Sequence, residues 1–245
     1  MENRIPTEHT PNWLRSLATL VCVLSCAGAF HPGASAAAQV DLSGAVVVTR
    51  PGELPNAERA AATVLVEEVE KRTGIRLAIS TTWPIGKPVI AITSQPEVSY
   101  WGHSIQPREG TDLPEKRPDG YRLLVDTQKS SSPVVWVVGS DARGTLYGVG
   151  ALLRNLDWGK GRALLPASLD TATAPAYPIR GHQLGYRARA NSWDAWDVAQ
   201  FDQYIRELAF FGINSVENIP FQDDRTAPLM KLSRREMNKK MSEIC

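Results

Sequence analysis

Five short segments in the first two thirds of the chain are rich in β-branched and other apolar residues, a pattern that predicts strands. They are Ala45–Arg50, Arg76–Ser80, Pro88–Ser94, Tyr121–Asp126 and Val134–Val138. A polar stretch at 129–132 separates the last two segments. We therefore expect those two strands to form a hairpin.

Two longer segments between these strands repeat apolar residues at helical spacing. The first opens with Asn56 as its expected N-cap, and Gly74 follows its last turn. The second spans Asp141–Leu156. Gly148 and Gly150 lie inside it without the Rossmann spacing, so we expect them to allow close packing against the sheet. A sheet with both helices on one face would bury the two apolar stripes.

Two stretches of the chain lack any periodicity. Residues 95–118 carry prolines, glycines and charges, so we expect a long surface loop that shields one edge of the sheet. His103 lies in this loop, and we assign it no role. Residues 164–178 combine alanine and threonine with three prolines, which indicates a connection between two domains.

After residue 178 the pattern becomes strand, helix, strand. Ile179–Tyr186 and Ile213–Ile219 are the strands, and the apolar stripe Phe201–Leu208 marks a helix that ends at Gly212. A capping box at Ser233–Glu236 begins another helix, inside which the sequence stops. This order opens a (β/α) repeat, and we expect a fragment of a longer protein. The alternative is a small two-layer appendage that packs onto the first domain.

The predicted fold class is therefore α/β. An N-terminal α+β two-layer sandwich, a sheet with two helices on one face, is expected over residues 39–173. The first strands and helices of an incomplete (β/α)8 TIM barrel are expected over residues 174–245. A signal peptide is expected over residues 1–38.

The N-terminus predicts export. Arg15 precedes the apolar run Leu17–Phe30, and Ala-x-Ala cleavage sites follow at 34–36 and 36–38. The run is too short to span a bilayer permanently, so we expect a secreted or periplasmic protein. The alternatives are an uncleaved anchor and a lipid anchor on Cys26.

Composition narrows the possible chemistry. Of the three cysteines, Cys22, Cys26 and Cys245, signal cleavage would remove two, which excludes an internal disulfide and a cysteine-based metal site. The formal net charge of +1 gives no reason to expect nucleic acid or an anionic membrane as partner. The chain has no G-x-S-x-G elbow, P-loop or H-E-x-x-H motif, and we expect no cofactor.

Polar and aromatic residues collect where the two strands of the last third end, which is where barrel enzymes bind substrate. This mixture suits a sugar, because planar polar groups hydrogen-bond hydroxyls and indole faces cover C–H surfaces. An arginine there could also bind a substrate carboxylate through two hydrogen bonds. Glu217 stands out as the one acid inside an apolar strand pattern. The candidate substrate-binding residues are Arg187, Asn191, Trp193, Asp194, Glu217 and Asn218.

Structural roles compete with this interpretation. Arg187 could pair with a neighbouring carboxylate, and Trp193 and Trp196 could pack under a loop. Asp197 is well placed to cap the following helix. His182, inside the first of these strands, is expected to face a core or an interface.

Three spaced motifs resemble the non-catalytic N-terminal domain and the start of the barrel in two groups of enzymes. The motifs begin at Asp119 (DGYRL), Val137 (VVGSDARGTLYGVGALL) and Ala174 (APAYPIRG). The two groups are the α-glucuronidases of glycoside hydrolase family 67 and the β-N-acetylhexosaminidases of family 20. The resemblance covers residues 42–220 and implies a barrel glycosidase.

The residues after the third motif distinguish the two groups. The hexosaminidase pattern continues with Leu-Asp and a substrate-binding Arg, but Gly185 stands at the Asp position and Ala188 at the Arg position. The glucuronidase pattern has an Arg followed by Asn-His-Trp-Asp. Arg187 and residues 191–194 (NSWD) resemble it, with one extra residue between them and Ser192 in place of the His.

Both families take their acid/base carboxylates from later strands, and no residue here matches either catalytic pair. The resemblance therefore implies the N-terminal portion of a secreted α-glucuronidase-like enzyme that removes xylan side chains, with no catalytic residue and no activity of its own. Two alternatives stay open. One is a hexosaminidase-like parent, and the other is a secreted carbohydrate-binding module with Trp193, Trp196 and Arg187 as its surface. Carbohydrate is the expected partner in each case.

Overall fold

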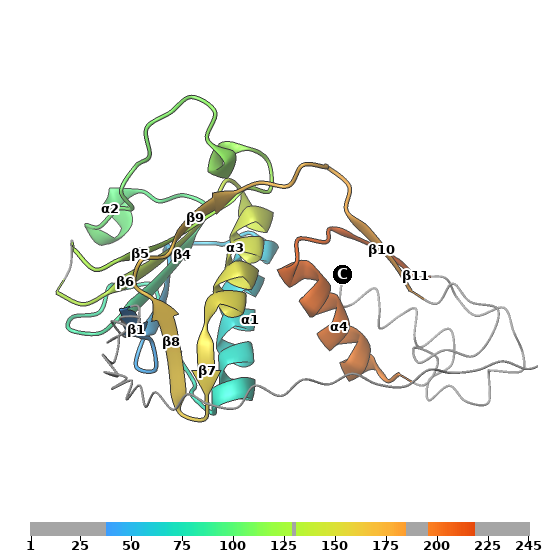
Figure 1. Ribbon diagram of the computed structural model, residues 1–245, viewed down its shortest axis with the longest axis horizontal. Helices are drawn as coiled ribbons and strands as arrows, with labels where there is room; N and C mark the ends of the chain where they lie inside the picture. The colour runs from blue at the N-terminus through green and yellow to red at the C-terminus, as the bar shows by residue number, and fades with distance from the viewer. Residues whose placement is uncertain (1–37, 129–130, 185–195, 219–245) are drawn as a thin grey trace, which may run out of the picture. The chain divides into compact units, whose positions relative to one another are not determined.

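The computed structural model describes residues 38–128, 131–184 and 196–218 (Figure 1). The chain divides into two compact units, 1–36 and 37–245, and every described residue belongs to the second. The predicted signal peptide, apart from its last residue, and the helix predicted from Ser233 lie outside the described residues. Within the described ranges, no helix has the length and apolarity needed to span a membrane.

A six-stranded mixed sheet forms the centre of the N-terminal part, in the order β3-β2-β4-β6-β5-β9. Four neighbouring strands are parallel, and β5 runs antiparallel to both of its neighbours. The strands are β2 (Val46–Thr49), β3 (Ala78–Ser80), β4 (Val89–Thr93), β5 (Tyr121–Asp126), β6 (Val134–Gly139) and β9 (Asp170–Thr173). All five strands predicted for this region are thus confirmed, including the β5–β6 hairpin.

Two helices cover one face of this sheet, as predicted. Helices α1 (Asn56–Thr73) and α3 (Ala142–Asn155) lie side by side against it (Figure 1). Alternation along a strand turns successive side chains to opposite faces, so Val47 joins the core beneath the helices while Val46 and Val48 join a cluster on the other face.

The boundaries of α1 correct one prediction and confirm another. Pro55 occupies the N-cap position and Asn56 is already helical, so Asn56 does not cap the helix. Its side-chain oxygen instead accepts a hydrogen bond from Arg59 Nη2 at 2.5 Å. Proline suits a helix start because its fixed φ is compatible and its missing N–H is not needed there. Gly74 ends the helix in the left-handed conformation with φ 76°, as expected.

The segment 95–118 covers a face of the sheet and also lies against its edge strand β9. It contains helix α2 (Val98–Trp101) and the short 3₁₀ helix η1 (Pro114–Lys116). Trp101 is buried in the same cluster as Val46 and Trp136, on the face opposite α1 and α3. The prediction of an edge shield is confirmed by η1, which contacts the edge strand β9. The cover of the face was not predicted, because a single buried indole without periodicity around it holds the loop there.

Several short strands were not predicted. The strands β1 (Gln39–Asp41), β8 (Arg162–Pro166) and β7 (Asp157–Gly159) form a second, antiparallel sheet. The predicted connection at 164–178 is therefore partly wrong, since Arg162–Pro166 and Asp170–Thr173 are both paired strands. The threonines and alanines of β9 show no alternation of apolar and polar residues. Such alternation is not required of them, because β9 lies at the edge of its sheet.

The last described elements form one strand–helix–strand unit, as predicted. Strands β10 (Gly181–Leu184) and β11 (Ser215–Asn218) pair in parallel, and helix α4 (Val198–Phe210) connects them. Asp197 caps α4 through a reciprocal capping box with Gln200, which confirms that prediction. A complete barrel stays a prediction.

A buried carboxylate ties α1 to the carboxyl ends of β2 and β4. The Glu58 side chain is fully buried in the first turn of α1. Its Oε1 accepts from Arg50 Nε at 3.2 Å, and its Oε2 accepts from Ser94 Oγ at 2.8 Å. The helix N-terminus adds a favourable field for this charge. Loss of either partner of this ion pair therefore leaves the other charge without its counter-charge.

We predict that Glu58→Ala lowers the free energy of unfolding by about 3 to 5 kcal/mol, because it leaves the Arg50 guanidinium buried without a counter-charge. The matched control is Glu70→Ala on the same helix, whose ion pair with Arg76 is exposed. That change should cost less than about 1 kcal/mol. Urea unfolding monitored by circular dichroism measures both, and equal losses would contradict the assignment.

Candidate functional site

The candidate site lies at the carboxyl ends of β10 and β11. Their register pairs His182 with Val216 and Gln183 with Glu217. Leu184 is completely buried against Phe201 of α4, so His182, Leu184 and Val216 face the helix. Alternation then places Gln183 and Glu217 on the opposite side of the two strands.

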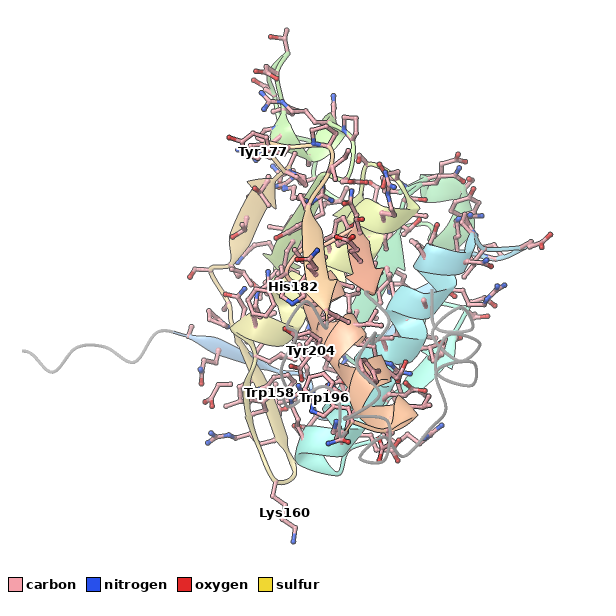
Figure 2. All side chains as sticks on the ribbon, turned by 90° about the vertical axis from the view of Figure 1, so that its right-hand side faces the viewer. Trp158, Lys160, Tyr177, His182, Trp196 and Tyr204 are labelled. Carbon is pink, nitrogen blue, oxygen red and sulfur yellow. The ribbon has the colours of Figure 1, made fainter. Side chains whose placement is uncertain are left out.

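The helix-facing side is a packed surface. Tyr204 Oη lies 3.0 Å from His182 Nε2, and the two rings meet edge to face. Trp196 packs on Tyr204 and Phe201 with ring centroids 5.1 and 5.3 Å apart. Figure 2 shows His182, Tyr204 and Trp196 following one another along this side. These contacts support the packing interpretation of Trp196 and the interface role expected for His182.

The opposite side is polar and exposed. Gln183 Nε2 donates to Glu217 Oε2 at 2.8 Å. An amide and a carboxylate held together in this way present donors and acceptors that match neighbouring sugar hydroxyls. Within β10 and β11, no second carboxylate shares this side of the strands with Glu217. The pair can therefore orient a ligand, but it does not form an acid/base couple.

The predicted site residues fall into two groups. Glu217 lies in β11 as the pattern indicates, and Asn218 is the last residue of that strand, paired in register with Leu184. Arg187, Asn191, Trp193 and Asp194 lie outside the described residues, and their roles stay predictions.

Arg180, immediately before β10, joins this unit to the N-terminal domain. Its Nη2 donates to Asp119 Oδ2 and its Nη1 to the Tyr177 carbonyl, each at 2.8 Å. Its Nε donates to the carbonyl of Gly212, just after α4, and its backbone N–H donates to Asn214 Oδ1. One guanidinium thus holds the start of β10, the end of α4 and the N-terminal domain.

Asp119 is the centre of this joint, and only 3% of its surface is exposed. Its Oδ1 accepts from Arg143 Nε at 2.8 Å, while Oδ2 accepts from Arg180. Its backbone N–H donates to Asp141 Oδ2 at 2.8 Å, and Asp141 Oδ1 in turn caps α3 through the Gly144 N–H. Asp119 has φ 60°, a conformation that aspartate tolerates better than most residues.

Two glycines of the joint allow backbones to approach closely. A Cβ on Gly144 would lie 2.2 Å from the Gly120 carbonyl oxygen, and one on Gly150 would lie 2.5 Å from Phe210 Cα. Gly150 therefore permits α3 to cross α4, whereas Gly148 faces Val137 of the sheet. The close packing predicted for these glycines is confirmed, with α4 as an additional partner.

Sequence reasoning missed the role of this joint. All of its charged members lie in the three motifs that begin at Asp119, Val137 and Ala174. The sequence does contain a signal for this joint, in the form of an Asp-Gly pair, a helix-capping Asp and an Arg-Gly pair. The partners are 24 and 61 residues from Asp119, so spacing along the chain could not connect them.

A cavity of about 210 Å³ lies within the joint. Tyr121, Tyr147 and Arg154 line it together with Phe210, and the Arg180 guanidinium lies 5.3 Å from the Tyr147 ring centre. Burial raises the pKa of Tyr147, and the nearby Asp119 carboxylate acts in the same direction, so this phenol stays neutral. The groups around this cavity hold β10 and α4 against the N-terminal part of the chain.

Comparison with protein families identifies the N-terminal part of the chain. The profile described as glycosyl hydrolase family 20, domain 2 matches residues 33–168, which is more than half of the chain. No curated protein sequence matches significantly.

The likeness to one solved structure supports the fold. The family GH115 4-O-methyl-α-glucuronidase BtGH115A, with specificity for decorated arabinogalactans, aligns with a TM-score of 0.53 and 16% identity over 82% of this chain and 28% of its own. The GH20 exo-β-N-acetylglucosaminidase from Vibrio harveyi aligns at 0.49, with 16% identity over 76% of this chain and 24% of its own. The Streptomyces plicatus β-hexosaminidase aligns at 0.48, with 17% identity over 75% and 32%. The chain spans about a quarter to a third of these proteins.

Asp141 gives the joint a pH dependence. Burial by itself raises the pKa of Asp141, but hydrogen bonds from the Asp119 and Gly144 N–H groups and from Ser140, with Arg143 nearby, outweigh burial and hold that pKa below its ordinary value. A lowered folded-state pKa contributes stability above the unfolded pKa of about 3.9, and this is lost as pH falls through the folded value.

We predict that Asp141→Asn lowers the free energy of unfolding by about 1 to 3 kcal/mol at pH 7, because an amide group replaces one of two accepting oxygens. The difference from the wild type should narrow below about pH 4, where the unfolded state takes up a proton on Asp141, and narrow further as the folded state takes up a proton at lower pH. Urea unfolding at pH 7, 4 and 2.5 measures this. Asp112→Asn, which removes an exposed ion pair with Arg117, is the control and should have a small, salt-sensitive effect. A constant difference across pH would contradict the role of Asp141.

Proposed function

The chain belongs to the family of glycosyl hydrolase family 20, domain 2, and on that premise we propose that it is the N-terminal, supporting portion of a secreted glycoside hydrolase. The suspected resemblance to the N-terminal domain of glycoside hydrolases is confirmed by this membership. Export, predicted from residues 1–38, is part of the proposal. Determining the N-terminal residue of the secreted protein would identify the cleavage site and so test the proposed export.

The parallel pairing of β10 with β11 across α4 carries the proposal of a barrel. One strand–helix–strand unit with parallel strands is the repeating element of the (β/α)8 fold, in which the side opposite the helices faces the barrel interior. Gln183 and Glu217 occupy that side. In this proposal they line the substrate-binding end of the barrel, and the Arg180–Asp119 ion pair fixes the first strand to its support.

An α-glucuronidase-like activity on xylan side chains fits the residues after β10 best. Arg187 followed by residues 191–194 (NSWD) supplies a guanidinium for a sugar carboxylate, an indole for the ring and two polar groups for hydroxyls. A pocket lined by β-branched or other apolar side chains has no group that pairs with a carboxylate, so it would not select an acidic sugar. The fold likeness to a 4-O-methyl-α-glucuronidase is compatible with this choice and does not by itself assign the substrate.

A hexosaminidase-like activity is the second candidate, and the matched family favours it. Against it, Gly185 and Ala188 stand where the hexosaminidase pattern has Asp and Arg. A uronic acid carries a carboxylate, whereas an acetamido sugar does not. The glucuronidase candidate therefore needs a cationic side chain beside the substrate, and the hexosaminidase candidate does not. A third candidate, a binding module without catalysis, shares the aromatic and polar residues but needs no barrel.

We predict that the 245-residue chain hydrolyses neither 4-O-methylglucuronosyl xylo-oligosaccharides nor 4-nitrophenyl N-acetyl-β-glucosaminide. Hydrolysis needs two carboxylates flanking the bond, or in family 20 a carboxylic acid acting with the substrate's own acetamido group, and both families take these acids from strands later than β11. The described strand ends offer one carboxylate, Glu217. Product release measured by chromatography and absorbance tests this. Turnover that survives in Glu217→Gln would show that a catalytic pair lies elsewhere in this chain.

We predict that, in the enzyme with its complete barrel, Arg187→Ala raises KM for 4-O-methylglucuronosyl xylo-oligosaccharides about 10- to 100-fold, as expected for a lost hydrogen bond to a charged group. Arg189→Ala, two residues away, is the matched control and should change KM little. For the wild-type enzyme, the methyl ester of the substrate should show a rise in KM by the same factor. Preferred turnover of the N-acetylglucosaminide, unaffected by Arg187→Ala, would favour the hexosaminidase candidate instead.

A further inference from the structure

Aromatic rings cluster on the face of the six-stranded sheet opposite α1 and α3. Trp83 lies 5.7 Å from Trp136 and 5.8 Å from Trp101 between ring centres. The imidazole of His103 stacks on Trp83 at 4.4 Å with an interplanar angle of 19°. Three of the seven tryptophans of the chain therefore meet at one place.

A cavity of about 370 Å³ opens beside these rings, a size within the range of about 300–1,000 Å³ typical of ligand pockets. Rings of Trp83, His103 and Trp136 line it together with the polar side chains of Ser104 and Asp126. Asp126 ends β5, and the loop after α2 supplies His103 and Ser104. Aromatic walls with a few polar groups are the usual composition of a small-molecule site.

The fold explains only part of this cluster. Trp136 and Trp101 are buried and cover the sheet, as a second layer must. Trp83 and His103 are half-buried on loops, with Trp83 packed against the edge of the buried cluster and His103 stacked on Trp83. Ile85, two residues after Trp83, is 98% exposed, so this loop presents apolar groups to solvent. The indole N–H of Trp101 is buried without an acceptor among the described residues, which leaves a donor unsatisfied inside the cluster.

We infer that this cavity is a carbohydrate-binding site that takes a neutral pyranose ring of a polysaccharide chain. The C–H faces of a pyranose pack on aromatic rings, and Trp83, His103 and Trp136 are aromatic residues in the walls of the cavity. Ser104 and Asp126 supply the hydrogen-bonding groups for hydroxyls at the rim. The Asp126 carboxylate repels a uronic acid, so the ligand is a neutral backbone sugar rather than an acidic side group.

This inference goes beyond the proposed function and does not depend on it. The cavity shares no residue with the ends of β10 and β11, and it lies on the sheet face opposite α1 and α3. A site here would hold polymer on the supporting domain itself. It can therefore be tested by binding alone, with the 245-residue chain and without any turnover.

The experiment is calorimetric titration of the chain with xylohexaose and with chitohexaose, repeated with Trp83→Ala, His103→Ala and Trp83→Phe. We expect binding of at least one hexaose, about tenfold weaker in the two alanine variants and largely restored by phenylalanine. Trp158→Ala is the matched control, since Trp158 is a half-buried tryptophan on β7 beside Arg72, and it should bind like the wild type. The hexaose that binds identifies the backbone.

Three outcomes would overturn the inference. They are no binding of either hexaose, equal affinities of the wild type and both alanine variants, and a preference for a glucuronosyl xylo-oligosaccharide that disappears on esterification of its carboxylate. Circular dichroism shows whether each variant is folded. If Trp83→Ala is unfolded, Trp83→Phe keeps the test valid. Failure here leaves the Arg187 result unchanged, so the two proposals fail separately.

Discussion

The buried Asp119 carboxylate is held between Arg143 and Arg180. The relative positions of the six-stranded sheet, the helices and the ends of β10 and β11 depend on this contact. A buried charge with two partners is costly to leave incomplete, because loss of either arginine removes compensation that water cannot supply. Since Arg143 belongs to α3 and Arg180 precedes β10, the carboxylate sets the position of one relative to the other. The backbone of the same aspartate is bound to the cap of α3, so the joint has no free rotation.

Close packing extends this constraint to α4. Gly150 allows the backbone of α3 to touch Phe210, and the Arg154 guanidinium donates to the Phe210 carbonyl while covering the Phe211 ring. Contacts near the surface add Arg206 with Glu67 and Lys71 with Gln203, and exposed pairs of this kind contribute little. The orientation of Gln183 and Glu217 therefore follows mainly from the ion pair and the glycine contact, both formed outside the strands that carry the site.

Much of the fold could be predicted because its central strands are continuous apolar runs, as in β4 and β6, and its helices carry a clear stripe. The strand Asp170–Thr173 could not be predicted, since an edge strand with exposed polar residues has no hydrophobic period to reveal it. The placement of Trp101 and the partners of Asp119 were equally hidden, because tertiary contact determines them. At the site, Glu217 was found as an acid in an apolar pattern, whereas its bond to Gln183 required the register of two strands.

The family match and the predicted substrate-binding residues occupy different parts of the chain, with the joint between them. The match ends at residue 168, before β10, and the motifs that carry the resemblance meet at Asp119. In the proposed enzyme, these motifs attach the barrel to its supporting domain, a requirement that is the same for any sugar. The proposed choice of substrate rests on the segment after Leu184, which supplies no member of the described ion pair. A resemblance that is strong in the joint and divided in that segment fits this proposal, because the attachment and the sugar are separate requirements.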